Sequence, residues 1–324
     1  MNYNRILALL LLALGLITCN NPKKGKNVPS VGFIEAFEDA TIADARKGFV
    51  DALSEEGYDE SKGTLSMIYK NAQGDMGTMN QIVSLMQAEE VACIGTSTTL
   101  STLAVAQRIK DIPIFMCVTA MPEILGLQSK DKISPPNLFG VGEDLNYIDT
   151  SFAIIKQVVK PRKAEGLRIG MIYNQAEQQS VDAFKRLDRL AKSNQVELVA
   201  LPLNSSADAQ LVVRALLRRK IDAFFANPDN TVFAAFETIL NNCSISNIPV
   251  FTSEIGLVKR GAVAAYGADI YQWGYQAGEE AAHYLKTGKT EGMKVEKVKL
   301  RRKVFNENAA KRYGFKFAEG FEKL

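Results

Sequence analysis

The chain has 324 residues, of which 47% are hydrophobic and 23% are charged, and its formal net charge is +3. These values are ordinary for a globular protein, and the scattered lysines and arginines do not favour a nucleic-acid-binding surface. The chain holds one histidine, His283, which excludes most Ser-His-Asp, Cys-His and histidine-metal chemistries. We therefore expect no metal, no cofactor and no enzymatic activity.

The first 30 residues predict export. The apolar run 6–17 follows Arg5 and has about twelve residues, which suits a secretory signal but falls short of the roughly 20 that a membrane-spanning helix needs. Leu16-Ile17-Thr18-Cys19 resembles a bacterial lipobox, which implies cleavage before Cys19 and acylation of its thiol; the alternative is an ordinary signal peptide in which Cys19 is incidental. We expect a signal peptide over 1–18 and a lipidated tether over 19–30, holding an exported protein at the cell envelope or in the periplasm.

The next segment alternates short apolar runs with amphipathic ones. Strands are expected at 31–34, 65–69, 91–94, 114–118 and 138–141, with helices at 43–56, 79–89 and 99–110. This β-α order is typical of a parallel sheet with helices on both faces. One α/β lobe is therefore expected to end near Gly142.

The same alternation then begins again. Helices are expected at 148–159, 180–194, 208–220 and 232–242, and strands at 168–173, 196–201, 221–226, 250–251 and 262–266. We predict two Rossmann-like α/β lobes, the first over 31–142 plus 268–324 and the second over 143–267. In this interpretation the helix 270–287, the strand 300–305 and a last short helix return to the first lobe.

The loops that follow the strands hold the candidate ligand-binding residues. In open parallel sheets these loops gather at one edge, where ligands bind. Each polar residue in them also suits a helix N-cap, which is the plainer interpretation of any one of them. The candidates are Glu35, Phe37, Thr96, Ser97, Thr98, Thr119, Asn174, Gln179, Asp229, Asn230, Ser253 and Glu254.

Their chemistry favours an amino acid ligand. The hydroxyl run 96–99 exceeds what one cap needs and suits a carboxylate, held by hydroxyls and backbone N–H groups. Asp229 and Glu254 suit an ammonium, because a buried ammonium needs a charged partner. Phe37, Phe139 and Tyr147 are candidates to pack the ligand's side chain, although an aromatic residue near a strand more often belongs to the core.

Several stretches together resemble the substrate-binding lipoproteins of ABC importers, in the subgroup whose members bind tryptophan, tyrosine or phenylalanine. The similarity runs from about Val31 to the C-terminus. The stretches are Ala45-Arg46-Lys47-Gly48-Phe49, Tyr69-Lys70-Asn71-Ala72-Gln73-Gly74-Asp75, Pro228-Asp229-Asn230-Thr231, Val258-Lys259-Arg260-Gly261-Ala262 and Tyr266-Gly267-Ala268-Asp269-Ile270-Tyr271.

The resemblance implies a type I periplasmic-binding-protein fold, with two lobes joined by a three-crossover hinge. It carries binding roles over to Thr96, Ser97, Thr98, Thr119, Asp229, Asn230, Ser253 and Glu254. The chain departs from relatives where they usually have Val-Thr-Asp-Pro, since it has Val118-Thr119-Ala120-Met121, and Glu254 stands where Asp is frequent. These departures leave the identity of the ligand open.

We therefore expect the solute-binding component of an ABC importer, a monomer that closes on a small molecule by a hinge near Gly142 and Gly267. The ligand is expected to be an amino acid, with an aromatic one as the narrower option. No GxxxxGK[ST] sequence is present, so the ATPase and the permease would be other chains. The alternatives are a sensory lipoprotein that presents its ligand to a receptor, or a binding protein for a nucleoside or sugar.

Overall fold

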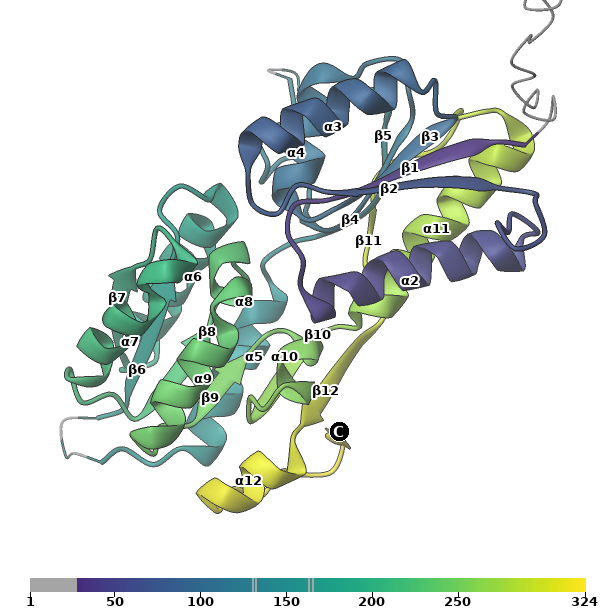
Figure 1. Cartoon of the computed structure of the whole chain (residues 1–324). Helices are drawn as coiled ribbons and strands as arrows, with labels where there is room; N and C mark the ends of the chain where they lie inside the picture. The colour runs from purple at the N-terminus through teal and green to yellow at the C-terminus, as the bar shows by residue number, and fades with distance from the viewer. Residues whose placement is uncertain (1–27, 130, 132, 163, 165) are drawn as a thin grey trace, which may run out of the picture.

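The computed structural model describes residues 28–129, 131, 133–162, 164 and 166–324. The expected signal peptide, Cys19 and most of the expected tether lie outside these residues. Two α/β lobes follow each other along the chain, as Figure 1 shows. This confirms the expected fold class.

The first lobe is built on a six-stranded parallel sheet with the order β11-β5-β4-β3-β1-β2. Its core strands are buried on both faces, as expected when helices cover both sides of a parallel sheet. The elements are β1 (Ser30–Glu35), α2 (Ala40–Glu55), β2 (Ser66–Asn71), α3 (Met76–Ala88), β3 (Cys93–Ser97), α4 (Thr99–Arg108), β4 (Ile114–Ala120), β5 (Leu138–Glu143), α11 (Ile270–Thr287) and β11 (Glu296–Lys297).

The second lobe is built on a four-stranded parallel sheet with the order β7-β6-β8-β9. Its elements are α5 (Tyr147–Val158), β6 (Arg168–Tyr173), α6 (Gln178–Ser193), β7 (Glu197–Pro202), the 3-10 turn η2 (Ser206–Asp208), α7 (Ala209–Leu217), β8 (Ala223–Ala226), α8 (Asn230–Ala234), α9 (Phe236–Ile245), β9 (Val250–Thr252) and α10 (Ile255–Lys259). The helix expected at 232–242 is divided into α8 and α9, and α10 was not expected.

A third, small sheet has the order β10-β12-β13 and lies beside the second lobe. It consists of β10 (Ala264–Ala268), β12 (Arg301–Phe305) and β13 (Glu322–Lys323), and α12 (Glu307–Tyr313) follows β12. The chain passes between the lobes three times, from β5 to α5, from β10 to α11 and from β11 to β12. Gly142 lies in β5 and Gly267 in β10, next to the first two of these crossovers.

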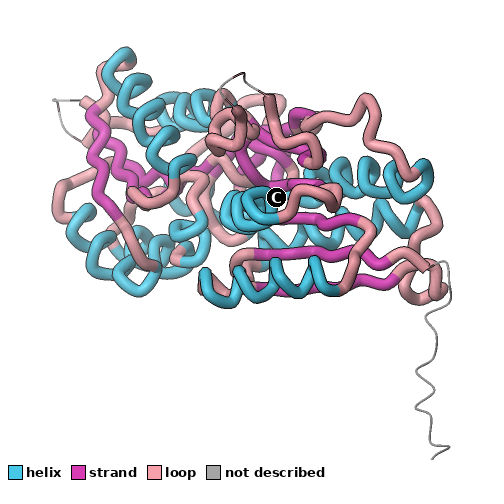
Figure 2. The backbone as a smooth tube through the Cα atoms, turned by 90° about the horizontal axis from the view of Figure 1, so that it is seen from above, coloured by secondary structure: helices cyan, strands magenta, loops and turns pink. Residues whose placement is uncertain are grey.

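The end of the chain corrects one expectation. Residues 301–324 do not return to the first lobe, because Phe305, Tyr313, Phe315, Phe317 and Phe321 pack against the core of the second lobe. Their rings also stack on one another, as in Phe305 with Phe317 at 4.9 Å between centroids. Of the expected C-terminal segment, α11 packs against the first sheet and β11 pairs with β5 at its edge. Figure 2 shows the C-terminus near the middle of the molecule.

The helices α2 and α11 cover one face of the first sheet and lie against each other (Figure 1). Their backbones meet at glycines. A Cβ atom on Gly274 would lie 1.9 Å from the carbonyl oxygen of Ala45, and one on Gly48 would lie 2.1 Å from that of Tyr271. This close approach holds α11 on the first lobe, although the chain enters the helix from the second.

We predict that Gly274→Ala lowers the free energy of unfolding by about 2 kcal/mol. Ala gains about 1 kcal/mol of helix propensity over Gly, but forcing its methyl group into a packed contact costs more. Urea denaturation measures the change. The matched control is Gly77→Ala in α3, where the added Cβ would approach only the side chain of Asp75, with the nearest atom at 3.2 Å. If the Gly274 variant is as stable as the control, the glycine contact does not matter.

Candidate functional site

A small cavity lies between the two lobes, where the polar loops after the strands face each other. Its volume is about 30 Å³, enough for one or two water molecules. The first lobe contributes Ile42, Thr98, Thr99, Val118 and Trp273 to its lining. The second contributes Tyr147, Glu177, Gln179, Pro228, Asp229, Asn230, Phe233 and Glu254.

The cavity brings together six of the residues singled out from the sequence, namely Thr98, Tyr147, Gln179, Asp229, Asn230 and Glu254. Three others stand directly behind its lining. The hydroxyl of Thr119 bonds that of Thr99 at 3.1 Å, the backbone N–H of Asn174 donates to Asp229 at 2.7 Å, and Ser253 bonds Glu254 at 3.2 Å.

The remaining candidates lie elsewhere. Glu35 accepts a hydrogen bond from the Tyr69 hydroxyl at 2.6 Å, because β1 pairs with β2 and its last residue joins a cluster with Tyr69 and Arg46. Phe37 packs on the core beside α3, Thr96 bonds Thr102 at 3.0 Å within the first lobe, and Ser97 is buried in the strand before the cavity. Phe139, considered for packing the ligand, is a core residue.

Two cavity residues hold backbone conformations that side chains rarely adopt. Thr98 has φ 78° and ψ 164°, in a region that is nearly restricted to glycine, and Val118 has φ 51°. Val118 lies where the pairing of β4 with β5 shifts register, between Met116 and Thr119. Strain of this kind costs about 1–3 kcal/mol per residue and clusters at functional sites.

The strained backbone at Thr98 leads into a helix start that the protein does not cap. No side chain of the described residues accepts a hydrogen bond from the first turn of α4. Thr98 is 2% exposed, and within the described chain its hydroxyl oxygen has no hydrogen-bond partner. Free N–H groups, the positive end of the helix dipole and a free hydroxyl together suit an anion.

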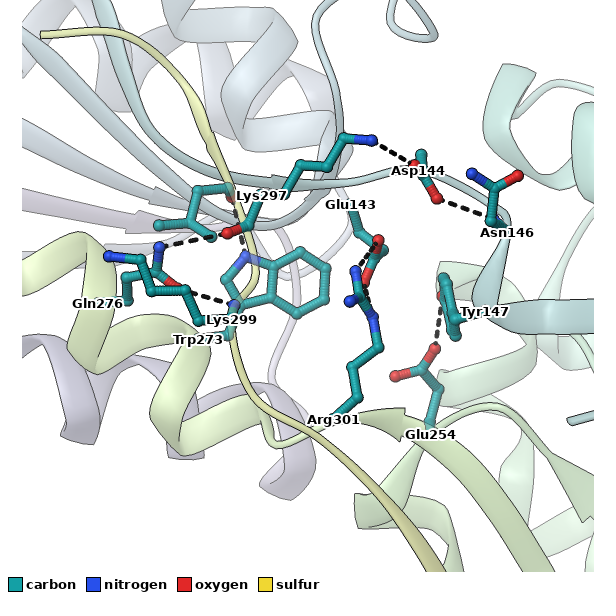
Figure 3. A network of polar contacts seen from close by, with 11 residues as sticks. Glu143, Asp144, Asn146, Tyr147, Glu254, Trp273, Gln276, Lys297, Lys299 and Arg301 are labelled. Carbon is teal, nitrogen blue, oxygen red and sulfur yellow. Dashed lines mark hydrogen bonds and ion pairs between the residues drawn. The ribbon is translucent and has the colours of Figure 1, made fainter. Parts of the chain in front are cut away.

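The opposite wall of the cavity carries Glu254, which is 3% exposed. Its Oε1 accepts hydrogen bonds from the hydroxyls of Tyr147 at 3.0 Å and of Ser253 at 3.2 Å, and Figure 3 shows Tyr147 and Glu254 facing each other. Burial raises the pKa of Glu254 to about 7, since the surroundings penalise the charged form. Its Oε2 receives no hydrogen bond from any described residue.

Asp229 and Glu177 form a second acidic group, and the protein satisfies both. Asp229 accepts from the backbone N–H groups of Asn174 and Val232 and from the Ser180 hydroxyl, and it caps α8. Glu177 accepts four hydrogen bonds, from Asn174, Thr231 and the backbone and side-chain amides of Asn230. Burial is the main reason that the pKa of each is raised, to about 7 for Glu177.

Beside the cavity, polar contacts join the crossovers, as Figure 3 shows. Glu143, at the end of β5, accepts two hydrogen bonds from Arg301 at 2.6 and 2.8 Å, and Asp144 pairs with Lys297 at 2.6 Å. Trp273 donates its indole N–H to the carbonyl oxygen of Val141 at 2.8 Å while its ring lines the cavity. The first and third crossovers are thus tied to each other, and the wall of the cavity is tied to the strand that leads into the hinge.

The lobes also touch directly across the cleft. Thr99 donates a hydrogen bond to Oε1 of Gln179 at 2.7 Å. Further out, Arg260 after α10 pairs with Asp39 before α2 at 2.7 Å, and the backbone at Gly256 lies against Thr41. The two lobes are therefore in contact, and the side chains between them leave a cavity of only about 30 Å³.

Sequence reasoning missed part of the lining. Thr99 and Glu177 belong to stretches that were recognised as polar, but Thr98 was chosen in the first stretch, and Asn174 and Gln179 in the second. Ile42, Phe233 and Trp273 belong to helices and have an ordinary apolar pattern, so no signal in the sequence distinguishes them from core residues. Tyr147 was considered only for packing, whereas it also donates a hydrogen bond to Glu254.

Two kinds of feature are absent from the described residues. None of their helices combines the length and the apolar character needed to cross a membrane. In the same part of the chain, no group of three or more His, Cys, Asp or Glu side chains is placed to hold a metal ion.

Known proteins resemble this chain over most of its length. A tyrosine-binding protein from Clostridioides difficile (strain R20291) is 30% identical over 273 residues, which is 84% of this chain and 77% of the relative. An ABC domain from Streptococcus pneumonia, solved with L-Trp, has a TM-score of 0.79 at 22% identity, over 90% of this chain and 96% of that one.

A substrate-binding protein with adhesive properties from Clostridium difficile, solved ligand-free and open, has a TM-score of 0.67 at 26% identity, over 92% of this chain and 99% of that one. Residues 30–323 match the family described as ABC transporter substrate binding protein. Since that match spans almost all the described residues, the chain belongs to the family of ABC transporter substrate-binding proteins.

Proposed function

We propose that this chain captures an amino acid between its lobes and delivers it to a membrane permease powered by a separate ATPase. The observation that carries the proposal is the pair of opposed walls in the cavity. One wall offers the uncapped start of α4 and the free hydroxyl of Thr98, and the other offers the free carboxyl oxygen of Glu254. An α-carboxylate and an α-ammonium match these two walls.

The apolar part of the lining supports an aromatic side chain. Ile42, Phe233 and Trp273 provide apolar surface between the two polar walls, and aromatic ligands gain from both burial and ring contacts. The relatives with known ligands, tyrosine in one and L-Trp in the other, agree with this choice. We therefore place this chain's ligand among the aromatic amino acids.

Capture requires the lobes to separate and close again. The cavity of about 30 Å³ is much smaller than the roughly 300–1,000 Å³ of ordinary ligand sites. A ligand that touches Thr98 in one lobe and Glu254 in the other favours closure only when both contacts form together. The three crossovers are the places where the chain would bend.

The remaining expectations complete the proposal. In it the protein is an exported monomer anchored through lipid at Cys19, it has no enzymatic activity, and it works with a permease and an ATPase encoded as other chains. Membership of the family supports the partners and the export.

Mass spectrometry of ligand released from the purified, denatured protein tests the ligand class, because it needs no prior choice of compound. A nucleoside or sugar in that sample would contradict the amino acid assignment.

A binding panel gives the direct test of function. We expect L-tyrosine, L-tryptophan or L-phenylalanine to bind with one ligand per chain in calorimetry, and we expect no turnover of the bound compound. The same amino acids with a blocked α-amino group should bind at least tenfold more weakly, since they lack the charge that faces Glu254. Equal binding of blocked and free amino acids would remove the proposed ammonium contact.

Substitutions separate the two acidic groups. We expect Glu254→Gln to weaken amino acid binding by at least tenfold, about 1.4 kcal/mol, with little loss of stability, because it removes the charge with the free oxygen. Asp229→Ala should weaken binding less than Glu254→Gln does, because both Asp229 oxygens already accept hydrogen bonds from the protein, and should lower the free energy of unfolding by about 1–2 kcal/mol through the lost cap. Glu319→Gln, at an exposed position, is the control. Unchanged affinity in either variant removes that residue from ligand binding.

Replacing the strained residue Thr98 should affect stability and ligand binding in opposite directions. Thr98→Gly should raise the free energy of unfolding by about 1 kcal/mol, because glycine adopts this conformation without strain. The same change should weaken binding several-fold, since it removes the hydroxyl and loosens the start of α4. Urea denaturation and calorimetry measure the two effects. A loss of stability would contradict the interpretation of Thr98 as strained.

A further inference from the structure

The cavity between the lobes holds acidic groups but no basic one. Glu177, Asp229 and Glu254 line it, and no lysine, arginine or histidine of the described residues does. A buried carboxylate without a cation is costly, and such a group normally keeps its proton. The state of these groups before the ligand arrives is therefore part of how the site works.

Glu254 is the acidic group that stands most open to the ligand. Asp229 and Glu177 give both of their oxygens to donors of the protein, as described above. Glu254 gives Oε1 to Tyr147 and Ser253, whereas Oε2 has no donor among the described residues. A cation in the cavity would change the environment of Glu254 most.

The surroundings of Glu254 supply no positive charge of their own. The phenol of Tyr147 on α5 is neutral, because burial raises its pKa well above the usual value. Glu143 on β5 adds negative charge, and its ion-pair partner Arg301 on β12 is already engaged with it at 2.6 Å. Lys297 of β11 is paired with Asp144, and Trp273 on α11, which lines the cavity, carries no charge.

These surroundings make the protonated form of Glu254 abundant in the ligand-free protein while its lobes are in contact, as they are in this structure. Desolvation by burial is the largest cause that raises the pKa of Glu254, to about 7, and the charge of Glu143 acts in the same direction. An ordinary glutamate is almost fully ionised at pH 7. Here about half of the molecules hold the proton at that pH, by the same titration relation.

We propose that capture of an ammonium-bearing ligand is coupled to release of a proton from Glu254. The inference rests on the proposed function and adds a condition to it. The ligand keeps all three ammonium protons and the Glu254 carboxyl loses its own to solvent, so that a carboxylate–ammonium pair forms and one H⁺ leaves. Ligand affinity is therefore highest above neutral pH and decreases as the medium becomes acidic.

The sign follows from the linkage of protonation with binding. The ligand lowers the pKa of Glu254, so the free protein binds more protons than the complex between the two pKa values, and affinity rises with pH there. With a free-state pKa of about 7, the apparent Kd should fall roughly tenfold from pH 6 to pH 8. The ligand's ammonium stays charged throughout this range, since α-amino groups of free amino acids titrate at higher pH.

Calorimetry with L-tyrosine and L-tryptophan in phosphate and in Tris at pH 7 tests the proposal. The two buffers differ in ionisation enthalpy, so the difference in observed enthalpy counts the protons released. We expect about 0.5 proton per ligand at pH 7, from the half-protonated carboxyl, and almost none at pH 8.5. Glu254→Gln should abolish the buffer dependence of whatever binding remains, while the exposed control Glu319→Gln should keep it.

A second measurement needs no ligand. A group whose pKa is raised by folding stabilises the protein below its unfolded pKa, and this contribution is lost as pH rises through the folded value. The melting temperature of ligand-free wild type should therefore fall between pH 5.5 and pH 8 relative to that of Glu254→Gln, which cannot ionise. If the melting temperatures of the two proteins change with pH in the same way across this range, the proposal is wrong.

The outcomes distinguish the two levels of the interpretation. If neither amino acid binds at pH 8, the proposed function fails, and the melting comparison still decides whether Glu254 titrates near neutrality. If an amino acid binds with equal enthalpy in both buffers and with constant Kd from pH 6 to pH 8, the proposed function stands and the proton coupling is wrong.

Discussion

The desolvation of acidic side chains between two lobes is the constraint on which this site depends. Water stabilises a carboxylate strongly, and a closed cavity of about 30 Å³ removes nearly all of it. The protein compensates for Asp229 and Glu177 with hydrogen bonds from amides and hydroxyls, yet it leaves one oxygen of Glu254 without a donor. Closure without a cation therefore favours the neutral acid at this position, and closure around an ammonium favours the ion.

The hinge and the cavity share structural parts, which in the proposed function would link ligand binding to movement of the lobes. Trp273 lines the cavity and donates to Val141 in the strand that leads into the first crossover, while Glu143 and Arg301 join the first crossover to the third. Because α11 is held on the first lobe by the glycine contact with α2, Trp273 belongs to that lobe. A ligand that touches Trp273 and Glu254 together thus bridges two bodies that the crossovers allow to move apart.

The sequence predicted the architecture, and several of its candidate residues line the cavity between the lobes, for a physical reason. Alternating β and α segments build parallel sheets, and the carboxyl ends of parallel strands share one edge, so Thr98, Gln179, Asp229, Asn230 and Glu254 were expected at the cleft. Glu35 has the same position at the end of a strand. The sheet order places β1 next to the edge strand β2, and Tyr69 engages its carboxylate. The order of the strands in the sheet cannot be predicted from the sequence pattern, so Glu35 could not be distinguished from the residues that line the cavity.

What the sequence did not show is the use that the protein makes of each polar side chain. Asp229 and Glu254 looked equivalent as partners of an ammonium, since both are acidic residues in loops after strands of the second lobe. The structure separates them by their hydrogen bonds: Asp229 caps α8 and accepts on both oxygens, whereas Glu254 keeps one oxygen free toward the cavity. A residue already satisfied by its own protein gains little from a ligand, so the acid that the protein leaves unsatisfied is the one that a ligand can favour most.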